Sequence, residues 1–347
     1  MNNGSKNSKG KILVTGGAGF IGSHTAVALV EAGYEPVIID NLSNSESGVL
    51  EALGNITGWN LSFYEADCRN KTALDTLAEK EGAFVGVMHF AAYKSVGESV
   101  KEPLKYYENN IGSLTALLDF ADRHSIPNFI FSSSCTVYGE PDDLPVTEDH
   151  PMKPAESPYG NTKQIGENIV RDFVAAKKNI KAVNLRYFNP IGAHPSGLIG
   201  ELPKGVPENL LPYLTQVAYG QREHLTIFGN DYDTRDGTCM RDYIHVMDIA
   251  RAHVDALAWL ESRSEPSINE VFNVGIGTGT TVLELIQAFE EATGVSVKYV
   301  IGERRSGDIE KVYADPKKIK ETIGWEPRHT ITDALRDSWN WQKNLRA

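Results

Sequence analysis

A tyrosine and a lysine stand four residues apart in the segment from Tyr159 to Lys163. Pro158 suits the first turn of a helix, and a helix that begins there places both side chains on one face. A phenol has a pKa of about 10 and is a poor base at neutral pH unless a nearby cation stabilises the phenolate. Lys163 supplies such a cation, so the pair predicts proton transfer by Tyr159. Chance placement of the two residues on a surface is the alternative.

A serine is the third candidate for this chemistry. Ser134 ends the apolar run Phe129–Ser134 (FIFSSS), which is typical of a buried strand. Ligands of open parallel sheets lie at the carboxyl ends of the strands, where a hydroxyl can pass a proton to a phenolate. Three serines at a strand end are also common as loop caps, which is the alternative role.

A glycine-rich turn, Gly16-Gly17-Ala18-Gly19-Phe20-Ile21-Gly22, follows the first apolar run and precedes a helical segment. Glycines there allow a tight turn, close approach of the backbone to a pyrophosphate and packing of helix on strand. The helix start then offers free N–H groups and its positive end to phosphates. The placement predicts a dinucleotide site, whereas the glycine spacing alone is also compatible with an ordinary strand–helix turn.

Two acids follow the next two predicted strands. Asp40 lies 18 residues beyond Gly22, where a carboxylate accepts hydrogen bonds from the adenosine ribose and repels a 2′-phosphate. We therefore expect NAD rather than NADP. Asp67 is predicted either to hold the adenine amino group or to cap the following helix.

The elements that position these residues alternate between short apolar runs and longer helical segments. The predicted strands are 11–15, 36–40, 61–64, 85–91, 129–134 and 182–187, and the main helices between them are 21–32, 104–124 and 158–176. This alternation predicts an α/β fold, a Rossmann-type doubly wound parallel sheet. Further helices are predicted at 211–219, 248–259 and 282–292. We expect a disordered tail over 1–10, an NAD-binding domain over 11–188 and a smaller α/β substrate domain over 189–347, with a partial return of the chain after residue 230 left open.

The bulk composition restricts the class of partner. The net charge of −12 argues against nucleic acid, which requires a basic face. No apolar run approaches the roughly 20 residues of a membrane helix, so we expect no membrane partner. Cys68, Cys135 and Cys239 are scattered, show no metal-ligand spacing and suit reduced thiols, so we expect a cytoplasmic protein without a metal.

The joint pattern of glycine turn, Asp40, Ser134, Tyr159 and Lys163 resembles the extended short-chain dehydrogenase/reductase superfamily. Further motifs resemble UDP-galactose 4-epimerases from Lys11 to about Gln342. They are VTGGAGFIGSHT, HFAAYKSVGESV, FSSSCTVYG, SPYGNTK, LRYFNPIGAHPSG, LTIFGNDYDTRDGTCMRDYIHVMDIA and ERRSGD.

The resemblance implies two sets of binding residues. The residues expected to contact NAD are Gly16, Gly19, Phe20, Ile21, Gly22, Asp40, Asn41, Asn44, Ser45, Asp67, Cys68, Phe90, Ala91, Ala92, Lys94, Asn109, Ser134, Tyr159, Lys163 and Tyr187. Those expected to hold a UDP-sugar are Asn189, Asn209, Leu210, Phe228, Arg241, Arg305, Asp308 and Val312. Guanidinium groups such as Arg241 and Arg305 match phosphate oxygens, although solvated surface charge is the more usual fate of arginine.

The resemblance also implies a reaction. Tyr159 takes the proton of the sugar's 4-hydroxyl, hydride moves between the fourth carbon and NAD, and the resulting 4-keto sugar turns before hydride returns to its other face. UDP-glucose and UDP-galactose are thereby interconverted. Related enzymes pair two long helices per subunit, so 104–124 and 158–176 are expected to form a homodimer interface. Val312 is expected to border the sugar, where a residue smaller than tyrosine leaves room for an N-acetyl group.

Two rival functions remain at this stage. A nucleotide-sugar 4,6-dehydratase begins with the same oxidation but carries an Asp-Glu pair after the strand-end hydroxyl residue, where this chain has Cys135 and Thr136. A non-catalytic NAD-binding regulator would tolerate loss of the tyrosine or lysine, whereas this chain retains Ser134, Tyr159 and Lys163 together.

Overall fold

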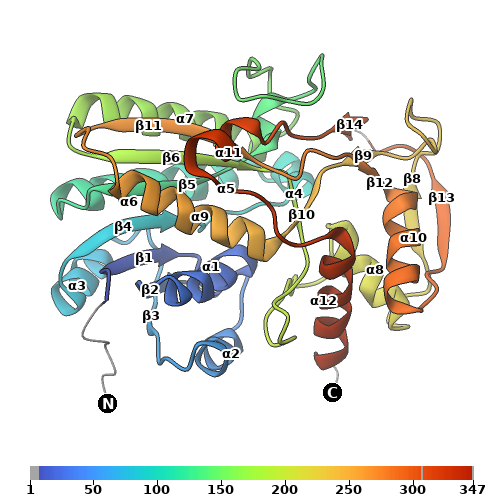
Figure 1. Ribbon diagram of the computed structural model, residues 1–347, viewed down its shortest axis with the longest axis horizontal. Helices are drawn as coiled ribbons and strands as arrows, with labels where there is room; N and C mark the ends of the chain where they lie inside the picture. Colours follow the sequence, from blue (N-terminus) through green and yellow to red (C-terminus); the bar gives the residue numbers. More distant parts are fainter. Residues whose placement is uncertain (1–7, 306–307, 346–347) are drawn as a thin grey trace.

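The computed structural model describes residues 8–305 and 308–345. Within them, seven parallel strands form one twisted sheet in the order β11-β6-β5-β4-β1-β2-β3 (Figure 1). Its strands are β1 (Lys11–Thr15), β2 (Glu35–Asp40), β3 (Ser62–Glu65), β4 (Phe84–His89), β5 (Asn128–Ser134), β6 (Lys181–Tyr187) and β11 (Ile268–Val274). The predicted doubly wound sheet is confirmed, and its six predicted strands are found within a few residues of their predicted bounds.

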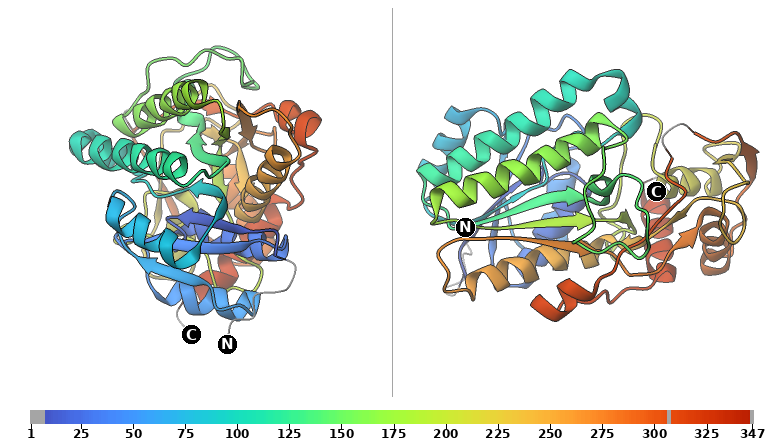
Figure 2. Two further views of the ribbon diagram at one scale, coloured as in Figure 1. Left: turned by 90° about the vertical axis from the view of Figure 1, so that its left-hand side faces the viewer. Right: turned by 90° about the horizontal axis from the view of Figure 1, so that it is seen from above.

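Helices cover both faces of this sheet (Figure 2). Each face has its own apolar core. One face is covered by α1 (Phe20–Glu31), α2 (Gly48–Thr57) and α9 (Val246–Glu261), and the other by α3 (Lys71–Glu81), α6 (Gly112–Arg123) and α7 (Pro158–Lys177). Alternation along β1 explains the two cores, because Ile12 and Val14 enter the first and Leu13 enters the second. Burial on both faces is why these strands read as continuous apolar runs.

The predicted helix 104–124 is interrupted in the structure. It consists of α5 (Pro103–Tyr106), a single π turn over Tyr107–Ile111 and α6, and is preceded by α4 (Val96–Lys101). The extra residue of a π turn changes which side chains face inward, and such turns occur often at functional sites. Here it turns Asn110 into the protein interior.

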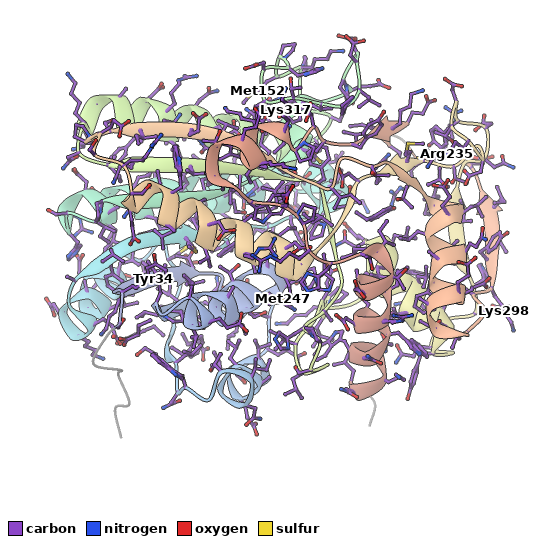
Figure 3. The ribbon with its side chains drawn as sticks, in the orientation of Figure 1. Tyr34, Met152, Arg235, Met247, Lys298 and Lys317 are labelled. Carbon is purple, nitrogen blue, oxygen red and sulfur yellow. The ribbon has the colours of Figure 1, made fainter. Side chains whose placement is uncertain are left out.

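The chain returns to the large sheet after leaving it. Strand β11 pairs with β6 from Ile268↔Lys181 to Val274↔Tyr187, and α9 packs against α1. Tyr34, labelled in Figure 3, donates a hydrogen bond of 2.6 Å to Glu261 at the end of α9 and so helps to hold the helix there. Residues far beyond position 189 therefore complete the large sheet and its helical cover.

The rest of the second half packs around a separate apolar core. Its helices are α8 (Leu210–Ala218), α10 (Val282–Thr293) and α12 (Ile331–Asn344), whereas α11 (Lys317–Ile323) packs on the core of the large sheet against β11 and α9. Its strands form three small sheets, which are β7 (Asn189–Ile191) with β10 (Tyr243–His245), β8 (Leu225–Phe228) with β13 (Tyr299–Gly302), and β9 (Met240–Arg241) between β12 (Thr280–Thr281) and β14 (Lys311–Val312).

The start of the chain is ordered earlier than the predicted tail allows. Residues 1–7 of that tail lie outside the described residues. The Lys9 amide donates to Gly33, and the Gly10 carbonyl accepts from Glu35 at the start of β2, so regular pairing begins before Lys11. Among the helices described, none combines the length and apolarity needed to cross a membrane.

Candidate active site

The residues predicted to do chemistry gather at the carboxyl edge of the large sheet. Asp40, Ser134 and Tyr187 end β2, β5 and β6, Gly16 follows β1 directly, and Phe90 follows β4. Parallel strands bring all five to one edge, which is where ligands bind in open α/β sheets.

The glycine-rich turn has the geometry that a pyrophosphate site requires. Gly16 has φ +68°, and a Cβ there would lie 2.7 Å from the backbone nitrogen of Ala91. A Cβ on Gly22 would overlap the Gly16 carbonyl oxygen, so α1 could not pack so closely on the turn with any other residue. Helix α1, which contains Phe20 and Ile21, begins after Gly19 with neither a capping side chain nor an acid in its first turn. Its positive end is therefore available to an anion.

Asp40 organises the loop after β2. Its carboxylate accepts the amides of Ala18 and Leu42 at 3.0 and 2.9 Å and the hydroxyl of Ser45 at 2.9 Å. The carboxylate thus connects the glycine turn to the segment that holds Asn41 and Asn44. Ionised carboxylates accept up to about four hydrogen bonds, so this group retains acceptor capacity for a ligand hydroxyl.

The structure excludes one of the two roles considered for Asp67, which is the cap of the following helix. Helix α3 is capped by Asn70, whose side chain accepts the Ala73 amide, so Asp67 is not the cap. Asp67 accepts two hydrogen bonds from the Arg69 guanidinium, at 3.0 and 2.7 Å. This hydrogen bonding lowers the pKa of Asp67, whereas burial raises the pKa of neighbouring Cys68 to about 12.

Tyr159 stands in the first turn of α7, as the proline predicted. Burial raises the pKa of Tyr159 to about 12, and a hydrogen bond with the Ser134 side chain opposes the rise. Ser134 also accepts the Thr136 amide at 3.2 Å and so caps the short 3-10 turn Cys135–Tyr138. The serine therefore caps this turn and is also hydrogen-bonded to the phenol. The expected lowering of the phenol pKa is not produced by the protein groups alone.

Lys163 is buried one turn after Tyr159. Its ammonium donates to the Ser132 carbonyl at 2.6 Å and lies 5.9 Å from the centre of the Tyr159 ring. Burial lowers the pKa of Lys163 to about 8, and the charge of Glu167 opposes this. The ammonium is therefore close to the phenol and is held by the backbone of β5.

His253 of α9, which the sequence patterns did not single out, orients Tyr187. Burial lowers the pKa of His253 to about 4, so the ring is neutral. Its Nδ1 lies 2.8 Å from the Ile249 carbonyl and must carry the proton, which leaves Nε2 to accept from the Tyr187 hydroxyl at 3.2 Å. The ring also contacts Phe90, with the ring centres 4.7 Å apart.

Asn110 is a second residue that the predictions missed, since they chose its neighbour Asn109. The Asn110 side chain accepts the Tyr93 amide at 2.9 Å, donates to the Tyr93 carbonyl at 3.0 Å and donates to Thr162 at 3.1 Å. It thus ties α7 to the loop that carries Ala91, Ala92 and Lys94. The Asn109 side chain donates to that of Asn110. A polar residue among the apolar positions of a helix is the signal that could have found it.

Two predicted residues from different sets meet at one carboxylate. Lys94 and Asn209 donate to Glu201 Oε1 at 2.7 and 2.6 Å. Leu210 follows as the first residue of α8. Glu201, in the loop that follows β7, thus links a residue expected to bind the cofactor to one expected to bind the UDP-sugar. Strand β7 itself begins at Asn189, another residue expected to bind the UDP-sugar.

The remaining UDP-sugar candidates lie on the small sheets and in the segment between β13 and β14. Arg241 of β9 is the register partner of Val312 of β14. Burial raises the pKa of Cys135, which follows Ser134, and the positive charge of Arg241 opposes this rise. The Arg305 guanidinium donates two hydrogen bonds to the Asp308 carboxylate, at 2.9 and 2.8 Å. The guanidinium carbon lies 4.9 Å from the centre of the Phe228 ring.

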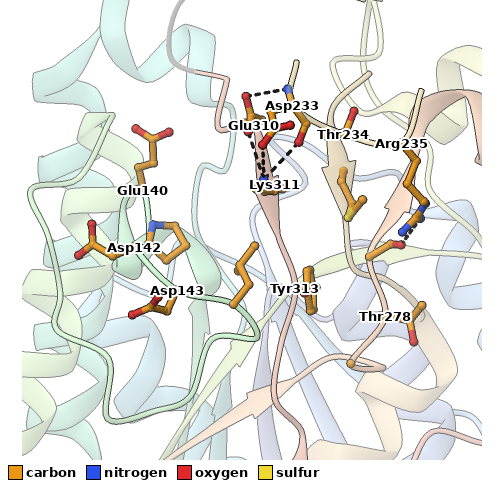
Figure 4. A pocket seen from close by; sticks show the side chains of 15 residues that line it. Glu140, Asp142, Asp143, Asp233, Thr234, Arg235, Thr278, Glu310, Lys311 and Tyr313 are labelled. Carbon is orange, nitrogen blue, oxygen red and sulfur yellow. Dashed lines mark hydrogen bonds and ion pairs between the residues drawn. The ribbon is translucent and has the colours of Figure 1, made fainter. Parts of the chain in front are cut away.

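None of these residues lines the cavity of about 730 Å³ whose lining is drawn in Figure 4. It is lined in part by Glu140, Met240, Lys311 and Tyr313. Since successive strand residues point to opposite faces, Met240 and Lys311 face this cavity while Arg241 and Val312 face away from it. The cavity is therefore behind the small sheet. Across residues 8–305 and 308–345, no cluster of three or more potential ligands is arranged to hold a metal ion.

Comparison with known proteins shows which family the chain belongs to. The family model described as GDP-mannose 4,6 dehydratase matches residues 13–338. A UDP-glucose 4-epimerase of Dictyostelium discoideum is 49% identical over 332 residues, which are 96% of this chain and 95% of that protein. The chain belongs to the UDP-glucose 4-epimerase family.

Solved structures of the family agree with this fold. The UDP-glucose-4-epimerase from Stenotrophomonas maltophila, with bound NAD and formylated UDP-arabinopyranose, superposes with a TM-score of 0.93 at 46% identity and covers 97% of this chain and 98% of its own. The UDP-Glc/GlcNAc 4-epimerase from Campylobacter jejuni has a TM-score of 0.82 at 38% identity, with 96% and 99% covered.

The two residues after Ser134 differ from the Asp-Glu pair that is expected of a nucleotide-sugar dehydratase. Cys135 and Thr136 occupy the 3-10 turn where a dehydratase needs a carboxylic acid and a carboxylate. Burial raises the pKa of the Cys135 thiol to about 12, so it is neither an acid nor a base of use at neutral pH. A dehydratase reaction has no acid–base pair at this position.

Proposed function

We propose that the protein is an NAD-dependent enzyme that interconverts UDP-glucose and UDP-galactose through a 4-keto sugar. The observation that carries the proposal is the meeting of Ser134, Tyr159 and Lys163 at the sheet edge that also holds the glycine turn and Asp40. Membership of the epimerase family supports it. The family structure from S. maltophila contains NAD.

The residues at the sheet edge fit NAD. The uncapped start of α1, the close approach of Gly16 and Gly22 and the spare acceptor capacity of Asp40 suit a pyrophosphate and a ribose diol. When bound, NAD supplies an acceptor for hydride from the sugar's fourth carbon and then returns the hydride to the opposite face. Its positively charged ring also supplies the charge that the buried phenol lacks from protein groups alone.

Tyr159 takes the proton from the sugar's 4-hydroxyl and later returns it, and Ser134 lies in the hydrogen-bond path. Lys163, fixed by the Ser132 carbonyl, holds a positive charge beside the phenol. Arg241, Arg305 and the loop from Asn189 to Leu210 hold the uridine diphosphate. Because those contacts stay in place, remote binding energy retains the intermediate while the sugar turns.

The test offers UDP-galactose to the purified protein and separates the products by chromatography. We expect UDP-glucose to accumulate until the ratio matches that reached from UDP-glucose. Absence of UDP-glucose, or formation of a dehydrated 4-keto-6-deoxy sugar, would contradict the proposal.

The proposal extends to sugars acetylated at the second carbon. Val312 is buried in an apolar cluster that includes Val137, Tyr138 and Phe188, with Cys135 at its border, and it faces away from the large cavity. Val312 is the register partner of Arg241 and shares its cluster with Cys135, which follows Ser134, and a tyrosine at this position would occupy more volume. The relative from C. jejuni is a UDP-Glc/GlcNAc 4-epimerase.

The assembly and setting are also proposed. The NAD-binding unit comprises 11–188 with the returning α9 and β11, and the UDP-sugar unit comprises most of 189–347. Two copies pair through α5, α6 and α7, which lie side by side on one flank (Figure 2). Exposed Leu104 and Val100, at the start of this flank, support the pairing. The free thiols of Cys68, Cys135 and Cys239 support a cytoplasmic setting.

A further inference from the structure

A buried ion pair lies behind the proposed catalytic residues. Arg186 Nε and Nη2 donate to the two carboxylate oxygens of Glu167 at 2.9 and 2.6 Å, and both side chains are only 5% exposed. The Ser133 hydroxyl donates to the same carboxylate at 2.5 Å. One carboxylate of α7 is thus held by donors from β5 and β6.

The members of this cluster adjoin the residues that carry the proposed chemistry. Ser133 and Arg186 are register partners on β5 and β6, and Ser134 and Tyr187 are the next pair along. Glu167 lies one helical turn after Lys163, on the same face of α7. The ion pair therefore fixes α7 against the two strand ends at the level of the active site.

Further contacts extend the cluster to neighbouring elements. Arg186 Nη1 donates to the Tyr138 hydroxyl at 2.9 Å and to the Glu148 carbonyl at 3.4 Å. The Tyr138 hydroxyl donates to the side-chain oxygen of Asn273 of β11 at 2.6 Å. The backbone N–H of Asn273 donates to the Glu148 carboxylate at 2.7 Å. The donors of the guanidinium and the acceptors of the carboxylate are both engaged, as a buried ion pair requires.

Stability alone does not account for such a pair. Burial removes both charges from water, and well-packed apolar side chains at the same positions would often be as stable. A fixed geometry is the specific benefit, since displacement of a reacting group by about 1 Å can cost roughly 100-fold in rate.

The pair also acts on the Lys163 ammonium through charge. The carboxylate of Glu167 opposes the fall in the Lys163 pKa that burial causes. Two further titratable groups near Lys163 are Tyr159 and His89 of β4, and burial lowers the pKa of His89 to about 3, so that ring is neutral.

We propose that Glu167 is a positioning residue for the oxidation and reduction of the sugar, and that it acts through Ser133, Arg186 and Lys163. This inference rests on the proposed function. Glu167 contacts none of the residues proposed to hold the UDP-sugar, so its role concerns turnover rather than substrate affinity.

Two single variants test this role, because they should move the pH profile of kcat in opposite directions. Glu167→Gln removes the negative charge near Lys163, whereas Arg186→Met leaves that charge uncompensated. The ammonium is present below the Lys163 pKa and is lost as pH rises through it. We expect the alkaline limb of the kcat profile to move to lower pH in the first variant and to higher pH in the second. We also expect kcat to fall about tenfold with KM for UDP-galactose within about twofold.

Lys177→Met is the matched control, because Lys177 lies on the same helix and pairs with Asp122 at the surface. It should leave kcat and the pH profile unchanged. If the charge variants do not fold, Ser133→Ala keeps both charges and should still lower kcat without changing KM. Wild-type kcat and coincident pH profiles in folded variants, or limbs that move in the same direction, would overturn the inference. An inactive wild-type protein would instead contradict the proposed function.

Discussion

At the scale of single residues, the proposed chemistry depends on a phenol whose pKa the protein raises rather than lowers. Burial raises the pKa of Tyr159 to about 12 and lowers the pKa of Lys163 to about 8. The protein therefore supplies a position and a nearby ammonium, and the cation of the oxidised cofactor supplies the rest of the stabilisation of the phenolate. Proton transfer is coupled in this way to the presence of oxidised cofactor.

Tyr159→Phe tests the proton-transfer role with little change in side-chain volume. We expect turnover of UDP-galactose to fall roughly 100-fold or more, because general acid–base catalysis is lost, while NAD stays bound. Initial rates and the nucleotide content of the purified variant are the measurements. Near wild-type turnover would show that another group moves the proton.

Lys163→Met tests the cation next to the phenol. Loss of the ammonium raises the pKa of Tyr159 further, so the phenolate forms only at higher pH. We therefore expect slower turnover and a rising limb of the pH–rate profile, set by phenolate formation, that lies at higher pH than in the wild type, without the falling limb that loss of the Lys163 ammonium gives. A slower variant with an unchanged profile would contradict the electrostatic role.

Asp40 gives a prediction about the cofactor itself. A carboxylate at this position attracts a ribose diol and repels a 2′-phosphate. Freshly purified protein should release NAD on denaturation, as measured by chromatography and an enzymatic assay specific for each dinucleotide. Recovery of mostly NADP would overturn this prediction.

At the scale of elements, the sequence predicted what local patterns determine. The first six strands were predictable because burial on both faces makes each of them a continuous apolar run. Helix α7 was predictable because Pro158 marks its first turn. The π turn at Tyr107–Ile111 and the contacts of Asn110 were not predictable. Asn110 bonds to Tyr93 in the loop after β4 and to Thr162 of α7, which are distant from it in the sequence. The contact of Glu167 with Arg186 joins residues 19 apart in the chain, and no local pattern reports it.

Strand β14 carries the prediction about substrate range. Val312→Tyr adds a large side chain in a close-packed cluster, so the variant should lose activity on UDP-N-acetylgalactosamine and keep activity on UDP-galactose. Ile319→Val is the control, because Ile319 is buried in a different apolar core, that of the large sheet. It should leave the ratio of the two activities unchanged. Absence of wild-type turnover of the acetylated sugar, where UDP-galactose is converted readily, would contradict the prediction.

At the scale of the whole molecule, the chain crosses between its two halves more than once. The strand and helix that complete the large sheet, β11 and α9, come from the second half of the sequence, while the C-terminal helix α12 packs on the separate core of α8 and α10. The UDP-sugar candidates and the sheet edge are therefore connected by several chain segments. That arrangement suits a site in which one ligand stays fixed while part of it turns.

The proposed pairing of two copies gives a prediction at this scale. Leu104 of α5 is 79% exposed, and Val100 of the preceding helix α4 is 61% exposed, at the start of the flank formed by α5, α6 and α7. Leu104→Lys should convert a dimer to a monomer in light scattering coupled to size exclusion, whereas Ile301→Lys, on exposed strand β13, should not. A monomeric wild-type protein would contradict the pairing.

The most direct test of the proposed reaction follows a deuterium atom placed on the fourth carbon of UDP-galactose, with the protein in ordinary water. Hydride that leaves the sugar and returns to its other face never exchanges with solvent. We therefore predict that the UDP-glucose formed retains deuterium at the fourth carbon, as measured by mass spectrometry and NMR. Replacement of the label by hydrogen from water would contradict hydride transfer and return.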